Sequence, residues 1–307
     1  MADPILATHN LTKQYGKRLA VDKLNLEIPE GEIFGFLGPN GSGKTTTIRM
    51  LLSLIRPSSG EAYCFGQSTR SNYPSYLRQI GAMVEKADFY GNLSALTNLQ
   101  MLARMHVNVG EERCMEVIER AGLLDRRHDP VKSYSHGMRQ RLGIAQAILH
   151  RPKLLILDEP STGLDPQGMH EMRQMILAFV RDEGMTVFLS SHLLNEVEQI
   201  CTSMAVLSEG KLLVSGPVKK FLSEETSTLT ELQAEPLSRA REIVTDLPFV
   251  SDLHDSSGGI RFRVNHEQRP AVIQALADAH VKVYTMNAVS NLEDYFLSLF
   301  GSKELSI

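Results

Sequence analysis

Three short apolar runs stand out in the first two thirds of the chain. They occupy residues 33–37 (Ile-Phe-Gly-Phe-Leu), 154–157 (Leu-Leu-Ile-Leu) and 186–190 (Thr-Val-Phe-Leu-Ser). Runs of this kind are typical of strands buried on both faces, as in a parallel sheet that is covered by helices. Helical patterns lie between them, among them residues 138–149 and 167–182. The pattern therefore predicts an α/β fold.

Two other segments of this region have the features of antiparallel strands. Residues 20–28 alternate apolar and polar side chains and are followed by Pro-Glu-Gly. Residues 205–207 and 211–215 are joined by Ser-Glu-Gly, which is typical of a tight turn. We expect a hairpin strand beside the parallel core and a second, later hairpin.

The pattern changes after about residue 221, where residues 223–227 form a polar link. The remaining residues predict two helices and four strands in the order β-α-β-β-α-β, which is the ferredoxin-like arrangement. The expected segments are 228–233, 236–247, 249–253, 260–264, 268–279 and 281–286. A last helix is expected at 290–300, where Ser-Asn-Leu-Glu fits a capping box. We therefore expect two domains, residues 1–222 and a small α/β domain over 228–307.

Composition narrows the class of protein. A length of 307 residues suits two domains, and 42% hydrophobic with 22% charged residues is ordinary for a soluble globular protein. The net charge of −4 provides no strong basic field, so no nucleic-acid partner is expected. No apolar run approaches the roughly 20 residues of a membrane span, and the N-terminus does not resemble a signal peptide. The spacing of Cys64, Cys114 and Cys201 fits neither a metal site nor a disulfide framework.

A phosphate-binding motif follows the first apolar run. Residues 38–46 read Gly-Pro-Asn-Gly-Ser-Gly-Lys-Thr-Thr and match G-x-x-x-x-G-K-[ST]. In such a loop the backbone N–H groups point at phosphate oxygens, Lys44 reaches the β- and γ-phosphates and the Thr45 hydroxyl ligates Mg²⁺. A flexible glycine-rich turn is the alternative, but the motif joins an expected strand to an expected helix at 45–54. The candidate nucleotide-binding residues are Gly38, Asn40, Gly41, Ser42, Gly43, Lys44, Thr45 and Thr46.

Two adjacent acids end the apolar run at 154–157. Buried carboxylates need a partner or a metal. In a phosphate-loop fold the acid on this strand holds Mg²⁺, which makes Asp158 a candidate metal ligand beside Thr45. Glu159 is the candidate for orienting or deprotonating an attacking water. The alternative, two ordinary solvated acids, is weakened by the phosphate loop.

Three further segments complete a resemblance to a known family. They are Tyr-Ser-His-Gly-Met-Arg-Gln at 134–140, Ser-Thr-Gly-Leu-Asp-Pro at 161–166 and Ser-Ser-His at 190–192. In this order, after the phosphate loop, they resemble the signature, the D-loop and the switch histidine of the ATP-binding subunit of an ABC transporter. The resemblance covers residues 5–220. It implies a P-loop NTPase fold with an antiparallel β subdomain and a helical subdomain.

The resemblance also implies roles for particular residues. Tyr15 lies where the family has an aromatic ring that stacks on adenine, and His192 is a candidate catalytic residue that handles the γ-phosphate. Ser135 and Gly137 would contact the ATP of a second subunit, and Asp165 belongs to the D-loop. In the family, two nucleotide-binding domains pair head to tail around ATP. The resemblance thus implies ATP and Mg²⁺ as cofactors. It also implies a second nucleotide-binding subunit, which is either another copy of the chain, giving the expected homodimer, or a related partner chain.

Two departures from the family pattern point to one branch of it. His136 and Met138 replace the usual Gly and Gln of the signature, and Glu85 replaces the usual Gln of the loop that touches metal, water and the membrane partner. Both changes resemble the bacterial export branch that includes bacitracin and multidrug efflux systems. Glu85 is accordingly a candidate contact to the nucleotide site, and a plain surface acid is the alternative.

The resemblance implies an ATPase that drives a separate membrane permease from the cytoplasmic face. The expected cargo is an antibiotic, peptide, lipid or drug-like compound, whose identity the sequence does not contain. A soluble ABC ATPase of translation or DNA repair is the main alternative, and a non-hydrolytic P-loop regulator is a third. For the C-terminal domain, reinforcement of the dimer, ligand sensing and passive packing all stay open.

Overall fold

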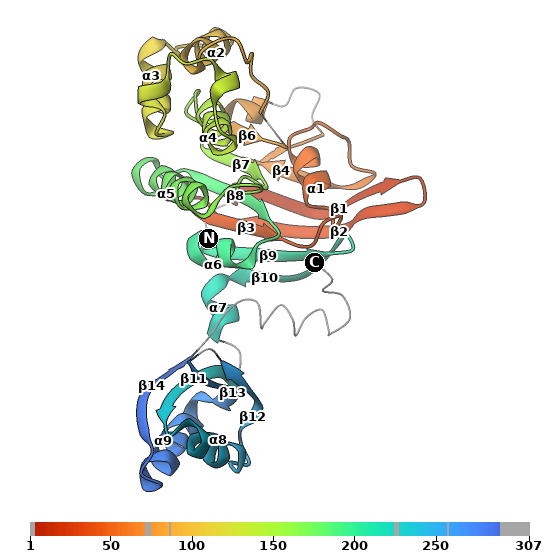
Figure 1. Ribbon diagram of the computed structural model, residues 1–307. Helices are drawn as coiled ribbons and strands as arrows, with labels where there is room; N and C mark the ends of the chain where they lie inside the picture. The colour runs from red at the N-terminus through yellow and green to blue at the C-terminus, as the bar shows by residue number, and fades with distance from the viewer. Residues whose placement is uncertain (1–3, 71–74, 86, 224–226, 257, 289–307) are drawn as a thin grey trace. The chain divides into compact units, whose positions relative to one another are not determined.

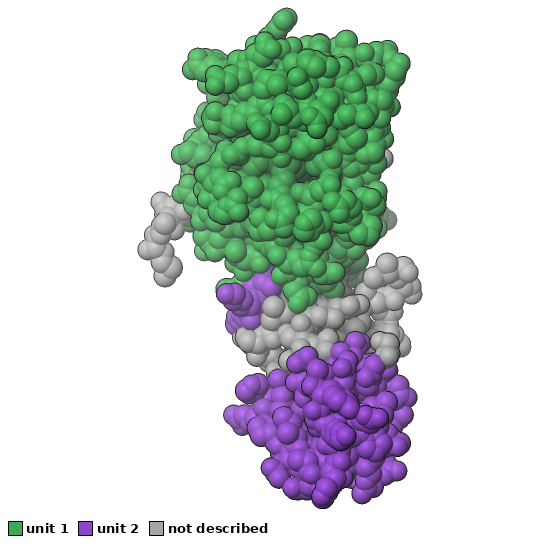
Figure 2. Space-filling view, turned by 60° about the vertical axis from the view of Figure 1, so that its left-hand side comes forward, with its two compact units in different colours: residues 1–217 green, residues 218–307 purple. Residues whose placement is uncertain are grey.

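The computed structural model describes residues 4–70, 75–85, 87–223, 227–256 and 258–288 (Figure 1). The chain divides into two compact units, Met1–Pro217 and Val218–Ile307 (Figure 2). The sequence places the end of the first domain at residue 222, a few residues later. The expected helix at 290–300 lies outside the described residues.

The first unit contains a six-stranded sheet with the order β10-β9-β3-β8-β7-β6. Its strands are β3 (Ile33–Leu37), β6 (Ile80–Met83), β7 (Leu154–Asp158), β8 (Thr186–Ser191), β9 (Ser203–Ser208) and β10 (Lys211–Pro217). Neighbours pair in parallel except for the hairpin of β9 and β10. The three apolar runs are the adjacent strands β3, β8 and β7, and every residue in them is buried. The predicted buried parallel core is confirmed.

An antiparallel sheet lies beside this core, in the order β2-β1-β4-β5. It consists of β1 (Leu6–Tyr15), β2 (Arg18–Ile28), β4 (Ser59–Cys64) and the short β5 (Gln67–Ser68). The turn of the long β1–β2 hairpin brings Tyr15 opposite Arg18. The expected hairpin strand at 20–28 is therefore correct, and its partner is the strand that carries Tyr15.

Helices complete the first unit. They are α1 (Lys44–Leu51), α2 (Ala95–Ala103), α3 (Glu111–Arg120), α4 (His136–Ala147), α5 (Pro166–Glu183) and α6 (Leu194–Ile200), with short 3₁₀ turns at Ser75–Gln79, Leu124–Arg126 and Val131–Ser133. Figure 1 shows α2, α3 and α4 grouped at one end of this unit, as the expected helical subdomain requires. Helix α4 begins two residues earlier than predicted, because the Ser135 hydroxyl caps it by accepting from the Met138 N–H.

The phosphate-loop helix is shorter than the predicted 45–54. It ends at Leu51, and Ser53 follows with a positive φ of 55°, a backbone conformation that does not continue a helix. Beneath it, the rings of Phe34, Phe36 and Phe188 pack together in the main core. This packing joins β3 to β8, the strands that precede the phosphate loop and His192.

The second unit has its own sheet and core. After α7 (Val218–Ser223), its elements are β11 (Ser227–Glu235), α8 (Leu237–Thr245), β12 (Ser251–Ser256), β13 (Gly259–Asn265), a 3₁₀ turn (His266–Gln268), α9 (Arg269–Asp278) and β14 (Lys282–Ala288). The antiparallel sheet has the order β12-β13-β11-β14, the strand order of a ferredoxin-like fold. Leu232, Phe262 and Val272 are among the fully buried residues of its core. In the described part of the chain, no helix is long and apolar enough to cross a membrane.

Candidate functional site

Two glycines let the loop between β3 and α1 fold tightly. A Cβ on Gly43 would lie 2.4 Å from the carbonyl oxygen of Ala20, and φ at Gly43 is 109°. A Cβ on Gly38 would lie 2.2 Å from the carbonyl oxygen of Leu207. Larger residues would push the loop away from β2 and β9, so glycine is required for the backbone to curl ahead of helix α1.

Lys44 begins α1 and is 5% exposed. Its Nζ donates to the carbonyl oxygens of Gly38 at 2.6 Å and of Pro39 at 3.2 Å. It also forms an ion pair with Glu159 Oε1 at 3.1 Å. The ammonium group is thereby held inside the curl of the loop, where a phosphate oxygen can replace one of its present acceptors.

Asp158 ends β7 and is 3% exposed. Its two carboxylate oxygens accept hydrogen bonds from Thr45 Oγ1 at 2.8 Å and from Ser190 Oγ at 2.6 Å. A hydroxyl and a carboxylate are hard oxygen donors of the kind that Mg²⁺ prefers. Among the described residues there is no group of three His, Cys, Asp or Glu side chains that could hold a metal. Mg²⁺ fits such a sparse set, because it usually keeps waters and substrate phosphates as its other ligands.

Glu159 follows with a positive φ of 49°, which turns its side chain away from that of Asp158. Its N–H donates to the Ser190 carbonyl and hydroxyl oxygens. Its Oε2 lies 2.6 Å from Nδ1 of His192 and accepts from the Thr162 hydroxyl at 3.3 Å. Burial works to raise the pKa of Glu159, but the contacts with His192 and Lys44 together hold that pKa below its usual value. The group is therefore a carboxylate at neutral pH.

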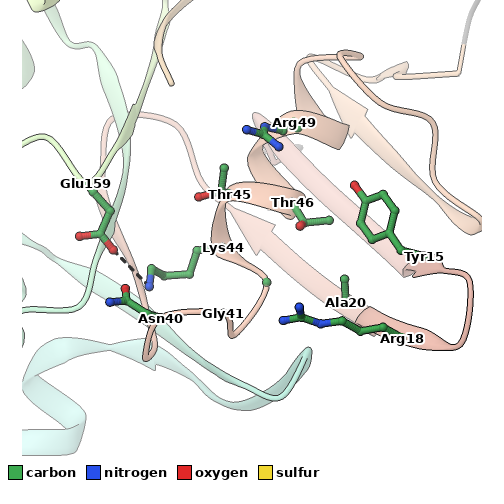
Figure 3. Close-up of a pocket in the computed structure, with 11 residues that line it drawn as sticks. Tyr15, Arg18, Ala20, Asn40, Gly41, Lys44, Thr45, Thr46, Arg49 and Glu159 are labelled. Carbon is green, nitrogen blue, oxygen red and sulfur yellow. Dashed lines mark ion pairs between the residues drawn. The ribbon is translucent and has the colours of Figure 1, made fainter. Parts of the chain in front are cut away.

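These residues border a pocket of about 440 Å³ (Figure 3). The predicted residues that line it are Tyr15, Asn40, Gly41, Gly43, Lys44, Thr45, Thr46 and Glu159. Figure 3 shows Tyr15 on the opposite side of the pocket from Glu159 and Lys44. The Tyr15 ring is half exposed, and Lys13 Nζ lies 5.0 Å from its centroid. The pocket thus has an aromatic end and a phosphate-binding end, which suits a nucleotide.

Sequence reasoning missed three residues of this pocket, which are Arg18, Ala20 and Arg49. Arg18 lies across the hairpin turn from Tyr15, and Arg49 is in the second turn of α1, after Lys44. Arg18 and Arg49 are close in the sequence to Tyr15 and Lys44, and this closeness was the available signal that they line the pocket. Neither arginine belongs to a motif. Arg18 adds positive charge to the pocket, whereas the charge of Arg49 is paired with that of Glu85.

Other predicted residues lie outside this pocket lining. Gly38 and Ser42 belong to the same loop, Asp158 accepts from the lining residue Thr45, and His192 contacts the lining residue Glu159. Glu85 forms an ion pair with Arg49, so it reaches the pocket edge through that side chain. The sequence-based roles of these residues stay predictions.

The residues of the signature and the D-loop lie outside the pocket, at the beginnings of helices α4 and α5. Ser135 is exposed and caps α4, while Asp165 caps α5 by accepting from the Gly168 N–H at 3.0 Å. Gly137 lies in the first turn of α4. The two segments are linked by a hydrogen bond of 3.1 Å between His136 Nε2 and the Thr162 carbonyl oxygen. None of Ser135, Gly137 and Asp165 lines the pocket of its own chain.

Comparison with known proteins is consistent with this site. Residues 21–162 match the model of a family described as ABC transporter. An uncharacterised ABC transporter ATP-binding protein of Bacillus subtilis (strain 168) is 44% identical over 97% of this chain and 96% of its own length. The bacitracin transport ATP-binding protein of Bacillus licheniformis is 40% identical over 97% of each chain. A lantibiotic transport ATP-binding protein of Streptococcus pyogenes is 41% identical over 68% of this chain and 90% of its own.

Solved structures agree on the fold. A dimeric ABC transporter cassette matches with a TM-score of 0.63 and 25% identity, over 69% of this chain and 98% of that chain. A dimeric cassette bound to ADP and Pi in a post-hydrolysis state gives a TM-score of 0.63 at 24% identity, with the same coverage. These matches share the architecture of α/β ATP-binding cassettes.

Proposed function

The chain belongs to the family of ABC transporter ATP-binding proteins, and we propose that it is the ATP-hydrolysing subunit of a transporter whose membrane permease is a separate chain. One observation carries the proposal for this chain. Lys44, Thr45, Asp158, Glu159 and His192 come from distant parts of the sequence and are joined by contacts of 2.6–3.1 Å.

The chemistry follows from these contacts. Lys44 binds the β- and γ-phosphates, and Thr45 and Asp158 would hold Mg²⁺. When bound, Mg²⁺ neutralises negative charge on the phosphate oxygens. Because its pKa is lowered, Glu159 stays ionised and accepts a hydrogen bond from the attacking water at neutral pH. A carboxylate of low pKa is a weak base, so Glu159 contributes mainly by aligning the water, while His192 keeps the carboxylate in place.

The signature acts across a dimer in this proposal. Ser135 and Gly137 lie at the N-terminal end of α4, which attracts negative charge, yet they do not line the pocket of their own chain. A second copy of the chain, paired head to tail, would bring its α4 N-terminus to the γ-phosphate. The dimeric cassettes among the structural matches support this arrangement.

Mixing two defective chains tests it. Lys44→Ala removes the phosphate-binding lysine and Ser135→Arg blocks the signature, so each variant alone should be inactive. In an equimolar mixture, heterodimers have one pocket with an intact Lys44 and an intact opposing Ser135, so ATPase activity should partly return. An inactive mixture, with wild-type chain active under the same conditions, would contradict a shared site.

For the transported substrate we propose export of an antibiotic, peptide, lipid or drug-like compound. The near full-length similarity to a bacitracin transport ATP-binding protein supports this, as does Glu85 in place of the usual Gln. The chain would work at the inner face of the membrane, bound to its permease. If a membrane protein is encoded beside this chain, co-expression of the two should raise the bacitracin tolerance of a susceptible host, and co-expression of that protein with Glu159→Gln should not.

A role in translation or DNA repair makes a different prediction. In that case the chain would co-purify with ribosomes or DNA rather than with the membrane fraction. Fractionation of cells that express a tagged chain separates the two functions.

A further inference from the structure

A buried hydrogen-bond chain lies behind His192. Ser191 ends β8 and has no solvent exposure. Its hydroxyl donates to Glu196 Oε2 at 2.6 Å and accepts from the Leu193 N–H at 3.0 Å. The second bond closes a turn around His192, because it joins the residues on either side of it. The position of the His192 backbone therefore depends on the Ser191 hydroxyl.

Glu196 fixes that hydroxyl from the first turn of α6 and is 9% exposed. The groups that face its carboxyl come from several elements: Ser191 from β8, Ser161 and Glu159 from the segment after β7, and Arg173 from α5. Burial raises the pKa of Glu196, and Glu159 adds to this rise. Keeping a carboxyl here is costly for stability, which favours a role in the site over a role in packing.

Packing of α6 has a separate source. Val197 is fully buried, and its methyl groups lie so close to β3 that a Cβ on Gly35 would be 2.8 Å from Val197 Cγ1. Ile200 is also buried. These apolar contacts hold the helix on the sheet without Glu196. Val197 is thus a matched control, since it is the adjacent residue, is also buried and has no polar link to His192.

We propose that Glu196 is a positioning residue for ATP hydrolysis: through Ser191 it fixes the turn around His192 and so keeps the His192 ring against the Glu159 carboxylate. The proposal rests on the proposed ATPase function. It gives Glu196 no contact with the nucleotide. Its effect passes from Glu196 to Ser191, then to the His192 turn, and from the His192 ring to Glu159.

The test compares Glu196→Ala, Glu196→Gln and Val197→Ala in the full chain, each with and without His192→Ala, by single-turnover phosphate release. Glu196→Ala should lower the hydrolysis rate about tenfold or more. Losses of this size are typical when a residue that supports a functional side chain is removed. The Kd for ATP should stay within about twofold, since Glu196 does not contact the pocket. Glu196→Gln retains an oxygen that accepts from Ser191 and should recover most of the rate.

The His192→Ala background distinguishes positioning from general damage. If Glu196 acts through His192, Glu196→Ala should cause no further loss there, whereas the effect of Val197→Ala should be the same in both backgrounds. An equal loss from Glu196→Ala in both backgrounds, or a loss seen only in ATP affinity, would overturn the proposal. Absence of turnover by the wild-type chain would instead count against the proposed ATPase function.

A second readout does not depend on activity. The NMR signals of the His192 ring, assigned by their loss in His192→Gln, should shift in Glu196→Ala and in Ser191→Ala but not in Val197→Ala. If Glu196→Ala does not fold, Ser191→Ala serves in its place, since it removes the bond to Glu196 together with the bond from the Leu193 N–H. Unchanged His192 signals in a folded Ser191→Ala chain would also overturn the proposal.

Discussion

The ammonium group of Lys44 lies 3.1 Å from the carboxylate of Glu159, and the two groups have different roles in the proposed hydrolysis. Lys44 has three N–H donors, and its three partners are Glu159, Gly38 and Pro39. A phosphate that binds Lys44 must therefore replace at least one of them. Glu159 is the only anion of the three, so it competes most directly with ATP.

Glu159→Gln should consequently separate binding from turnover. The hydrolysis rate should fall at least about 100-fold, because the group that aligns water is lost. The affinity for ATP should rise about fivefold, which corresponds to ~1 kcal/mol for removal of the competing ion pair. Isothermal titration of ATP measures the second effect. Lys44→Ala/Glu159→Gln should show no such gain over Lys44→Ala, and weaker ATP binding by Glu159→Gln alone would contradict the competition.

The lowered pKa of Glu159 predicts acid sensitivity. A carboxyl whose pKa is lower in the folded than in the unfolded chain adds stability above the unfolded value of 4.5, and that stability is lost as pH falls through the folded pKa. Urea unfolding at pH values from 6 down to 3 should therefore show a decline in the free energy of unfolding. The decline should be shallower in Glu159→Gln. Identical slopes for the two chains would show that Glu159 is not responsible.

Glu196 predicts the opposite dependence. Its pKa is raised by burial, so its contribution is most favourable while it is protonated and weakens as pH rises above 4.5 through the folded pKa. Glu196→Gln should therefore be more thermostable than wild type near pH 7, and the difference should shrink near pH 4. Thermal unfolding at both pH values measures this, and a Gln variant that is less stable at pH 7 would be inconsistent with it.

Tyr15 lies at the aromatic end of the pocket, and its ring is open for a base to stack on. Tyr15→Ala should weaken ATP binding by about 1–3 kcal/mol, which is roughly 5- to 150-fold in Kd. Tyr15→Phe retains the ring and should bind nearly as well as wild type. Binding of inorganic triphosphate, which has no base, should be the same for all three chains; a loss there would indicate damage to the phosphate loop instead.

Residues 1–222 should form an ATP-binding unit by themselves. The core of the first unit and the core around Phe262 have no residue in common, so each has its own source of hydrophobic stabilisation. A chain that ends at residue 222 should bind ATP with a Kd within about twofold of that of the full chain, because distant sites that share no contacts affect each other little. Loss of ATP binding by a folded truncated chain would show that the C-terminal unit supports the site. A change in dimerisation alone would favour its role in the dimer.

The sequence predicts those parts of the fold and site that depend on local chemistry. Apolar runs reveal β3, β7 and β8, since each is buried on both faces. The run Ile80–Met83 is not revealed in this way, because β6 has four residues and one of them is Gly81. Its glycine is explained only by the fold, in which a Cβ there would lie 2.1 Å from the Ala147 carbonyl oxygen.

The site divides in the same way. The phosphate loop and Asp158 are contained in short motifs, so their place in the sequence is enough to find them. Arg49 and Glu196 have roles that depend on which distant residues the fold brings near, and spacing along the chain does not contain that information. Ser191 is the clearest case: in the sequence it is one more serine, whereas in the fold its hydroxyl is buried and makes two hydrogen bonds.

Two neighbouring serines at the end of β8 serve different halves of the site. Ser190 donates to Asp158, the proposed metal ligand, and Ser191 donates to Glu196 behind His192. Because successive side chains of a strand point to opposite faces, a shift of β8 by a single residue would leave a serine at only one of these two places. Both hydrogen bonds of the site can therefore form only when β8 pairs in its native register. A chain with a misregistered β8 would therefore lose ATP hydrolysis, because one half of the site would lack its serine hydroxyl.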